Sequence, residues 1–94
     1  MIKSVAYERA LNFSVRIVHL YKYLKDEKKE YIMSKQLMRS VTSIGANLAE
    51  AIHGQSKKDF IVKVYISLKE ASETQYWLEL LYKTGYLTNE ISEN

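Results

Sequence analysis

The sequence predicts an all-α fold: an antiparallel up-down helical bundle of three long helices followed by a truncated fourth. Apolar residues recur at intervals of three and four through most of the chain. Proline is absent, and only three glycines interrupt the 94 residues. The alternation of apolar and polar residues that marks a strand is not sustained anywhere. A chain of this length allows one domain, which we expect to span residues 1–94.

The first predicted helix covers residues 4–26. One ridge of this helix is formed by Tyr7, Leu11, Ser14, Val18, Tyr21 and Lys25, and a second line by Ala10, Phe13, Ile17, Leu20 and Leu24 widens it. The apolar face is therefore broader than a coiled-coil seam, as is typical of a bundle. The charged run KDEKKE at 25–30 predicts a solvated turn after this helix.

The second predicted helix covers residues 34–53. Its core face is formed by Leu37, Val41, Ile44, Leu48 and Ile52. Ser34 is predicted to be the N-cap and Gly54 the C′ residue. Gly45 stands in the middle of this helix, where glycine costs about 1 kcal/mol relative to alanine. We therefore expect another helix to approach closely at Gly45.

The third predicted helix covers residues 57–84. Ser56 followed by Asp59 matches a capping box, and Gly85 is predicted to end the helix. A heptad-like seam predicted to face the core consists of Ile61, Val64, Leu68, Ala71, Gln75, Leu78 and Tyr82. A second apolar line, about 100° or more around the helix, consists of Val62, Ile66, Trp77 and Leu80. One core cannot easily cover both lines, so the second line is predicted to meet another subunit.

Several blocks of this sequence resemble a known protein family. These blocks are SKQLMRSVTSIGANLAEA at 34–51, QSKKDF at 55–60, ISLKEASETQYWLELL at 66–81 and TGYL at 84–87. They are similar to the four-helix-bundle protein family, which is also called the 23S rRNA intervening-sequence protein family. The resemblance implies a four-helix up-down bundle that assembles into ring-shaped homo-oligomers, typically pentamers.

The same resemblance carries functional expectations. Some members of the family are encoded inside rRNA intervening sequences, and a related branch serves as the accessory protein of diversity-generating retroelements. That branch binds nucleic acid and a reverse transcriptase, whereas most members have no established activity. The family usually carries a full fourth helix. Here Thr88 or Asn89 caps at most one further turn, so we expect only a stub.

A polar ladder lies on the second predicted helix, beside its apolar stripe. It consists of Gln36, Ser40, Ser43, Asn47 and Glu50, whose spacing of four and three keeps them on one face. One interpretation is a polar seam between helices or subunits that fixes their register. The other is a binding groove lined by Asn47 and Glu50. We favour the seam, and expect Asn47 and Glu50 to bond to the third helix or to a neighbouring subunit.

The sequence offers little that would support catalysis. Glu50 and His53 form an E-x-x-H pair, which is half of a helical di-iron site, but His19 has no carboxylate at matching spacing. No nucleophile–base pair and no Gly-rich phosphate loop occur. Glu70 and Glu73 are better suited to ion pairs with Lys69 or with the basic first half of the chain. We therefore predict no enzyme activity, no metal or other cofactor, and no small-molecule substrate.

The charge is distributed unevenly along the chain. Residues 1–58 hold eleven Lys or Arg and five Asp or Glu, whereas residues 59–94 hold three and six. This asymmetry predicts either a charge match between molecules or a basic surface on the first two helices. The candidate nucleic-acid contacts are Arg9, Arg16, Lys22, Lys25, Lys29, Lys35 and Arg39. With neighbouring tyrosines these residues can bind phosphates and stack bases, or they can form an ordinary solvated surface.

These observations lead to one expectation and one alternative. We expect a non-enzymatic bundle that self-associates, as a ring, and acts as an interaction scaffold. The alternative is a nucleic-acid-binding accessory protein that uses RNA or DNA as its partner. Cysteine is absent, no apolar run approaches the roughly 18 residues of a membrane span, and charges at Lys3, Glu8 and Arg9 argue against a signal peptide. The expected location is the cytoplasm, with no membrane partner.

Overall fold

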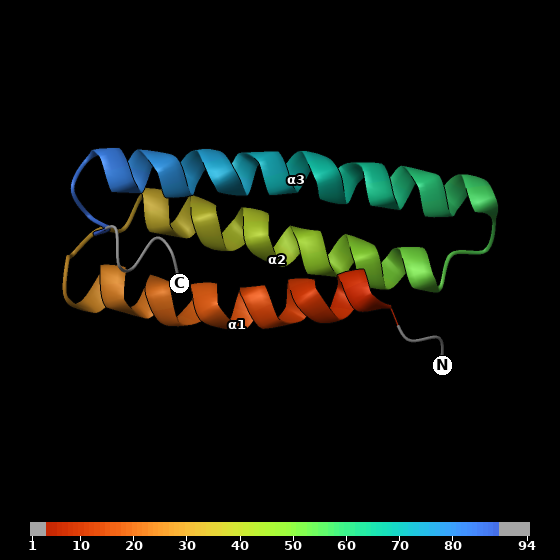
Figure 1. Cartoon of the computed structure of the whole chain (residues 1–94), viewed down its shortest axis with the longest axis horizontal. Coiled ribbons are helices and arrows are strands. Elements are labelled where there is room, and N and C mark those ends of the chain that lie inside the picture. The colour runs from red at the N-terminus through yellow and green to blue at the C-terminus, as the bar shows by residue number, and fades with distance from the viewer. Residues whose placement is uncertain (1–3, 89–94) are drawn as a thin grey trace.

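The computed structural model describes residues 4–88, and within this range the chain forms three helices and no strand (Figure 1). The helices are α1 (Val5–Asp26), α2 (Met33–Ile52) and α3 (Lys57–Lys83). Each agrees to within one residue at either end with its predicted range. The predicted stub of a fourth helix falls on residues 89–94, which lie outside the described part of the chain.

The three helices lie side by side, with α2 in the middle and the chain turning back at each connection (Figure 1). The backbone of α2 approaches both neighbours closely, whereas the backbones of α1 and α3 do not approach each other. The described part of the chain is therefore an open layer. Within this range, no helix combines the length and the apolar character that a membrane span requires.

The start of α2 differs from the prediction, because Ser34 is not its N-cap. Ser34 lies inside the first turn, fully buried, and its hydroxyl donates to the carbonyl oxygen of Glu30 at 2.7 Å. The side chain of Glu30 does the capping instead. Its carboxylate accepts the backbone N–H groups of Ile32, Met33 and Ser34 at 3.1, 3.0 and 2.7 Å. One carboxylate thus satisfies three N–H groups at a helix start that have no partner within the helix.

The backbone around Glu30 explains how its side chain reaches α2. Lys29, immediately before it, has φ 55°, in the left-handed region. The Glu30 N–H donates to the carbonyl oxygen of Leu24 at 2.9 Å, which ties the connection to the end of α1. Burial raises the pKa of Glu30, but the N–H bonds from Ser34, Met33 and Ile32 outweigh it, so the pKa lies below its ordinary value.

Both ends of α3 follow the predicted local signals. Ser56 is the N-cap, and its hydroxyl oxygen accepts the N–H of Asp59 at 3.0 Å. Gly85 has φ 88° and donates to Tyr82, while Tyr86 donates to Leu81, at 3.1 and 2.9 Å. This pair of bonds is a Schellman motif, in which glycine readily adopts the left-handed conformation. The motif directs the following residues back across the end of the layer.

The core occupies one end of the layer, where α1 ends, α2 begins and α3 ends. Its buried members are Ile17, Leu24, Leu37, Val41, Leu81 and Leu87. The apolar lines predicted for α1 and α2 supply the first four of these residues, and the turn after Gly85 places Leu87 over the cluster. Trp77 and Leu78 of α3 pack against it as partly buried neighbours. The C-terminal part of α3 therefore takes part in the core, whereas its N-terminal part does not.

The core seam predicted along α3 is wrong for most of its members. Ile61 and Leu68 are 55% and 62% exposed, and Ala71, Gln75 and Tyr82 are also exposed. Among the helices of the described range, only α2 approaches the backbone of α3 closely, so only a narrow face of α3 is covered. That face repeats every seven residues through Ser67, Thr74 and Leu81, which are buried.

Candidate functional site

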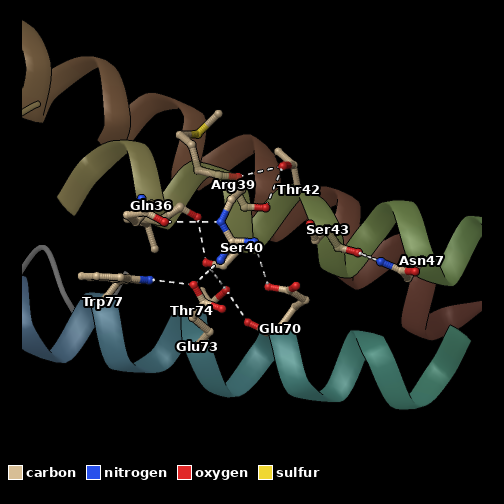
Figure 2. Close-up of polar contacts among 12 residues, drawn as sticks. Gln36, Arg39, Ser40, Thr42, Ser43, Asn47, Glu70, Glu73, Thr74 and Trp77 are labelled. Carbon is tan, nitrogen blue, oxygen red and sulfur yellow. Dashed lines mark hydrogen bonds and ion pairs between the residues drawn. The ribbon is translucent and has the colours of Figure 1, made fainter. Parts of the chain in front are cut away.

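A series of polar contacts joins α2 to α3 (Figure 2). Ser40 is fully buried there, and its hydroxyl oxygen accepts a hydrogen bond from the hydroxyl of Thr74 at 2.9 Å. The hydroxyl of Ser40 in turn donates to the carbonyl oxygen of Leu37 at 3.1 Å. Two turns earlier on α3, the hydroxyl of Ser67 donates to the carbonyl oxygen of Ile44 at 3.0 Å. Small hydroxyl side chains thus allow the two helices to approach closely and to satisfy their polar groups.

An ion-pair cluster flanks these hydroxyl contacts (Figure 2). The guanidinium of Arg39 lies 3.5 Å from Glu70 and also bonds to Glu73, whose carboxylate accepts the indole N–H of Trp77 at 3.2 Å. The hydrogen bond from Arg39, followed by that from Trp77, lowers the pKa of Glu73 below its ordinary value. The expectation that Glu70 and Glu73 accept ion pairs from the basic first half of the chain is confirmed.

The remaining members of the polar ladder make contacts of different kinds. Glu50 pairs across the helices with the ammonium of Lys63 at 2.9 Å, as expected. Asn47 donates to the carbonyl oxygen of Ser43 at 2.8 Å, so its bond stays within α2. Gln36 accepts a bond from the Arg39 Nε at 3.4 Å on the exposed side. Within residues 4–88, every buried side-chain nitrogen or oxygen atom has a hydrogen-bond partner.

The α3 side of this seam was not predicted from the sequence. Thr74 meets the ladder at Ser40, and Ser67, seven residues earlier on the buried face of α3, meets the backbone of α2 at Ile44. Leu81 follows Thr74 by the same interval of seven residues and is also buried. A search for small hydroxyl residues at heptad spacing on the third predicted helix would have found Ser67 and Thr74.

The geometry offers no grouping suited to a metal in the described range. Between residues 4 and 88, no three His, Asp or Glu side chains lie close enough together to hold an ion. Glu50, the glutamate of the E-x-x-H pair, forms an ion pair with Lys63, and His53 is exposed beyond the end of α2.

The end of α2 agrees with the prediction. Its C-cap is His53, and Gly54 follows in the predicted C′ position.

The basic candidates for nucleic-acid contact are separated into three places. Most of them surround the connection between α1 and α2: Lys22, Lys25, Lys29 and Lys35. Arg9 and Arg16 are exposed on α1, farther from this connection. Arg39 is held by acidic residues of α3, and hydrogen bonding to Glu73 raises its pKa. At the connection, the ammonium of Lys25 lies 5.5 Å from the centre of the Tyr21 ring.

The four residues predicted to form an oligomer interface have different environments. Val62 is 47% exposed. Ile66 and Leu80 are half-buried. Trp77 packs against the core of its own chain and meets Tyr76 edge to face, with ring centres 5.0 Å apart. The indole of Trp77 thus already contributes to the fold of one chain, and its part in an interface stays a prediction.

A shallow groove of about 240 Å³ runs between α1 and α2. Its lining consists of Tyr7, Leu11, Ser14, Thr42, Gly45, Ala46 and Ala49. The prediction that another helix approaches closely at Gly45 is wrong within residues 4–88, because no other helix in this range would meet a Cβ atom there within 4 Å. The reason is that α1 lies beside α2 at this level without closing over the glycine.

Comparisons with known proteins agree on one relationship. The family model described as 23S rRNA-intervening sequence protein matches residues 3–94. Among solved structures, the chain is similar to a crystal structure of a protein with unknown function from the S23 ribosomal protein family of Bacteroides thetaiotaomicron VPI-5482. The two share 58% sequence identity with a TM-score of 0.92, over 95% of this chain and 82% of that one. A search of curated proteins finds no match.

Proposed function

Because this chain belongs to the 23S rRNA-intervening sequence protein family, we propose that it is a non-enzymatic helical-bundle protein that self-associates and acts as an interaction scaffold. In this proposal its helices are those of an antiparallel up-down bundle. The assembly is a ring, for which the family resemblance favours a pentamer, and it works in the cytoplasm.

The observation that carries this proposal is the apolar surface of α3. Ile61, Tyr65, Leu68 and Tyr76 are each more than half exposed on a single helix. Monomeric soluble proteins rarely leave contiguous apolar patches of large extent in water. Burying these side chains against another copy of the chain stabilises an assembly by about 25 cal/mol for each Å² removed from water.

The polar seam between α2 and α3 supports a structural role over a catalytic one. Ser40 bonds to Thr74, Arg39 to Glu70 and Glu73, and Glu50 to Lys63. These groups satisfy one another and are not arranged around a common cavity. A seam of this kind fixes the register of two helices, which is what a scaffold requires.

The mass of the protein in solution tests the proposal. We expect light scattering to give a mass several times 11.0 kDa, and dilution to lower it only at concentrations near the dissociation constant of the assembly. A wild-type chain that stays at 11.0 kDa over the whole concentration range contradicts the scaffold proposal.

A second candidate function is nucleic-acid binding, and the observation that favours it is the group of lysines at the α1–α2 connection. Lys22, Lys29 and Lys35 are exposed and form no ion pair within residues 4–88. Each copy in a ring would present the same group, which raises avidity for a long phosphate backbone. The pairing of Arg39 with Glu70 and Glu73 weighs against Arg39 as a phosphate contact.

A gel-shift titration with RNA and DNA fragments checks this candidate. We expect binding that weakens steeply with salt. A variant with Lys22, Lys29 and Lys35 replaced by glutamine should flatten the slope of log K against log salt by roughly 0.7–0.9 for each phosphate that is no longer neutralised. The matched control replaces Lys57, Lys58 and Lys69, which lie on α3. No shift at low salt removes this candidate, and equal weakening in both variants shows that only net charge matters.

A further inference from the structure

We propose that the groove between α1 and α2 receives the outer face of α3 from a second copy of the chain. The outer face consists of Ile61, Tyr65, Leu68, Ser72, Tyr76 and Glu79, all of which are exposed and follow one another at intervals of three or four residues. This inference rests on the proposed self-association and names the two surfaces that meet in it.

Gly45 lies in the wall of the groove, and the fold of a single chain supplies no reason for a glycine there. A glycine in the interior of a helix costs about 1 kcal/mol relative to alanine. No other helix and no side chain within residues 4–88 would touch a Cβ atom at this position within 4 Å. Ala46 and Ala49, on the same wall of the groove, have small side chains. The backbone of α2 is therefore accessible to a helix that approaches from outside.

The groove and the outer face have complementary shapes. Small residues of α2 form one wall of the groove, and Leu11 of α1, which is 45% exposed, is part of the other. The outer face carries large side chains instead, with Tyr65 63% and Leu68 62% exposed. Helices usually pack with the large side chains of one in a groove between small side chains of the other. This packing removes apolar surface of both partners from water.

Opposite charges on the two surfaces also match in register. Lys22 follows Leu11 by eleven residues on α1, and Glu79 follows Leu68 by eleven residues on α3. Eleven residues are about three helical turns, or roughly 16 Å, so each charge projects from the same side as its leucine. When α3 of one copy runs parallel to α1 of the next and its Leu68 lies at Leu11, Glu79 reaches Lys22.

The groove is basic at this same end on α2 as well. Lys35 lies seven residues before Thr42, which places it two turns along the same side of α2. Glu79 is the one acidic residue of the outer face, and Lys83 follows it one turn later on the same side of α3. In this arrangement Glu79 meets lysines from both walls of the groove.

The contact joins two different surfaces, so each copy offers one groove and one outer face. Such a heterologous contact repeats from copy to copy and closes into a ring when the rotation between copies permits it. One kind of contact is therefore sufficient to build a ring.

Disulfide capture tests the contact directly, because the chain contains no cysteine. Chains carrying Ala46→Cys and chains carrying Leu68→Cys are co-expressed and oxidised, so any bridge must join two copies. We expect a covalent dimer at twice 11.0 kDa as the main product. The matched control pairs Ala46→Cys with Phe60→Cys, an exposed position on another side of α3 that belongs neither to the outer face nor to the line predicted to meet another subunit. Capture by Phe60→Cys that equals or exceeds capture by Leu68→Cys overturns the inference.

A charge exchange provides a second test that does not depend on oxidation. We expect Glu79→Lys to raise the dissociation constant of the assembly about tenfold, and Glu79→Lys combined with Lys22→Glu to restore most of the affinity. Failure of the double variant to recover overturns the register. An oligomeric wild type that fails both tests rejects this contact alone, whereas a monomeric wild type rejects the proposed self-association with it.

Discussion

Replacing Leu37 with alanine is expected to lower the free energy of unfolding by about 3 kcal/mol. Leu37 has no exposed surface and lies in the cluster with Leu24, Leu81 and Leu87, which joins all three helices and the turn after α3. Removing its side chain leaves a cavity at the point where these segments meet. Because small domains are only marginally stable, a loss of this size leaves a large part of the population unfolded.

Urea unfolding followed by circular dichroism measures this loss. Val15→Ala is the matched control, because Val15 is half exposed on α1 and its truncation should cost less than about 0.5 kcal/mol. A Leu37→Ala variant as stable as Val15→Ala would show that the cluster is not the main support of the fold.

The second large effect is expected from Glu30→Ala, which removes the cap of α2. Three backbone N–H groups lose their acceptor, including that of Ser34, which has no access to water. We expect a loss of about 2–3 kcal/mol at neutral pH, at the upper end for a single capping residue. Glu27→Gln is the control, because Glu27 lies in the same charged run at 25–30 but its side chain is exposed.

The effect of Glu30→Ala should also depend on pH in a defined direction. The fold lowers the pKa of Glu30 below its ordinary value of 4.5, so the unfolded chain takes up a proton more readily than the folded one. The contribution of this carboxylate is complete above about pH 4.5 and is lost as the pH falls through its lowered folded value. Unfolding free energies of wild type and variant, measured from neutral to acid pH, should therefore converge in acid. A constant difference across the range would show that charge plays no part in the cap.

The contrast between Ser56 and Ser34 shows where local sequence is sufficient and where it is not. Ser56 caps α3 with a bond to a residue three positions later, and such a bond is visible in the sequence. Ser34 matches the same local pattern, but the side chain of Glu30 caps the helix in its place. The approach of Glu30 to α2 depends on the left-handed backbone at Lys29. The charged run at 25–30 reads as a solvated turn, and nothing in the run itself distinguishes the one carboxylate that folds inward.

The two apolar lines of α3 illustrate a different limit of sequence reasoning. Periodicity identifies the helix and its ends, but the side that is covered depends on how many neighbours the helix has. With α2 as its only neighbour in the described range, α3 buries the line through Ser67 and Thr74 and leaves Leu68 exposed. The polar ladder on α2 was predictable because it lies within one helix. Its partners on α3 were not, because pairing Ser40 with Thr74 requires the register between the helices.

The placement of Leu87 over the core has a consequence for how the molecule opens. Leu87 and Leu24 close one end of the layer, whereas side chains such as Ile61 at the other end remain in water. Separating the helices at that other end disrupts little buried surface, so local unfolding is far less costly there than at the closed end. Among the described helices, only α2 approaches the first residues of α3, so we expect this end of the layer to open more readily than the end at which Leu87 lies over the core.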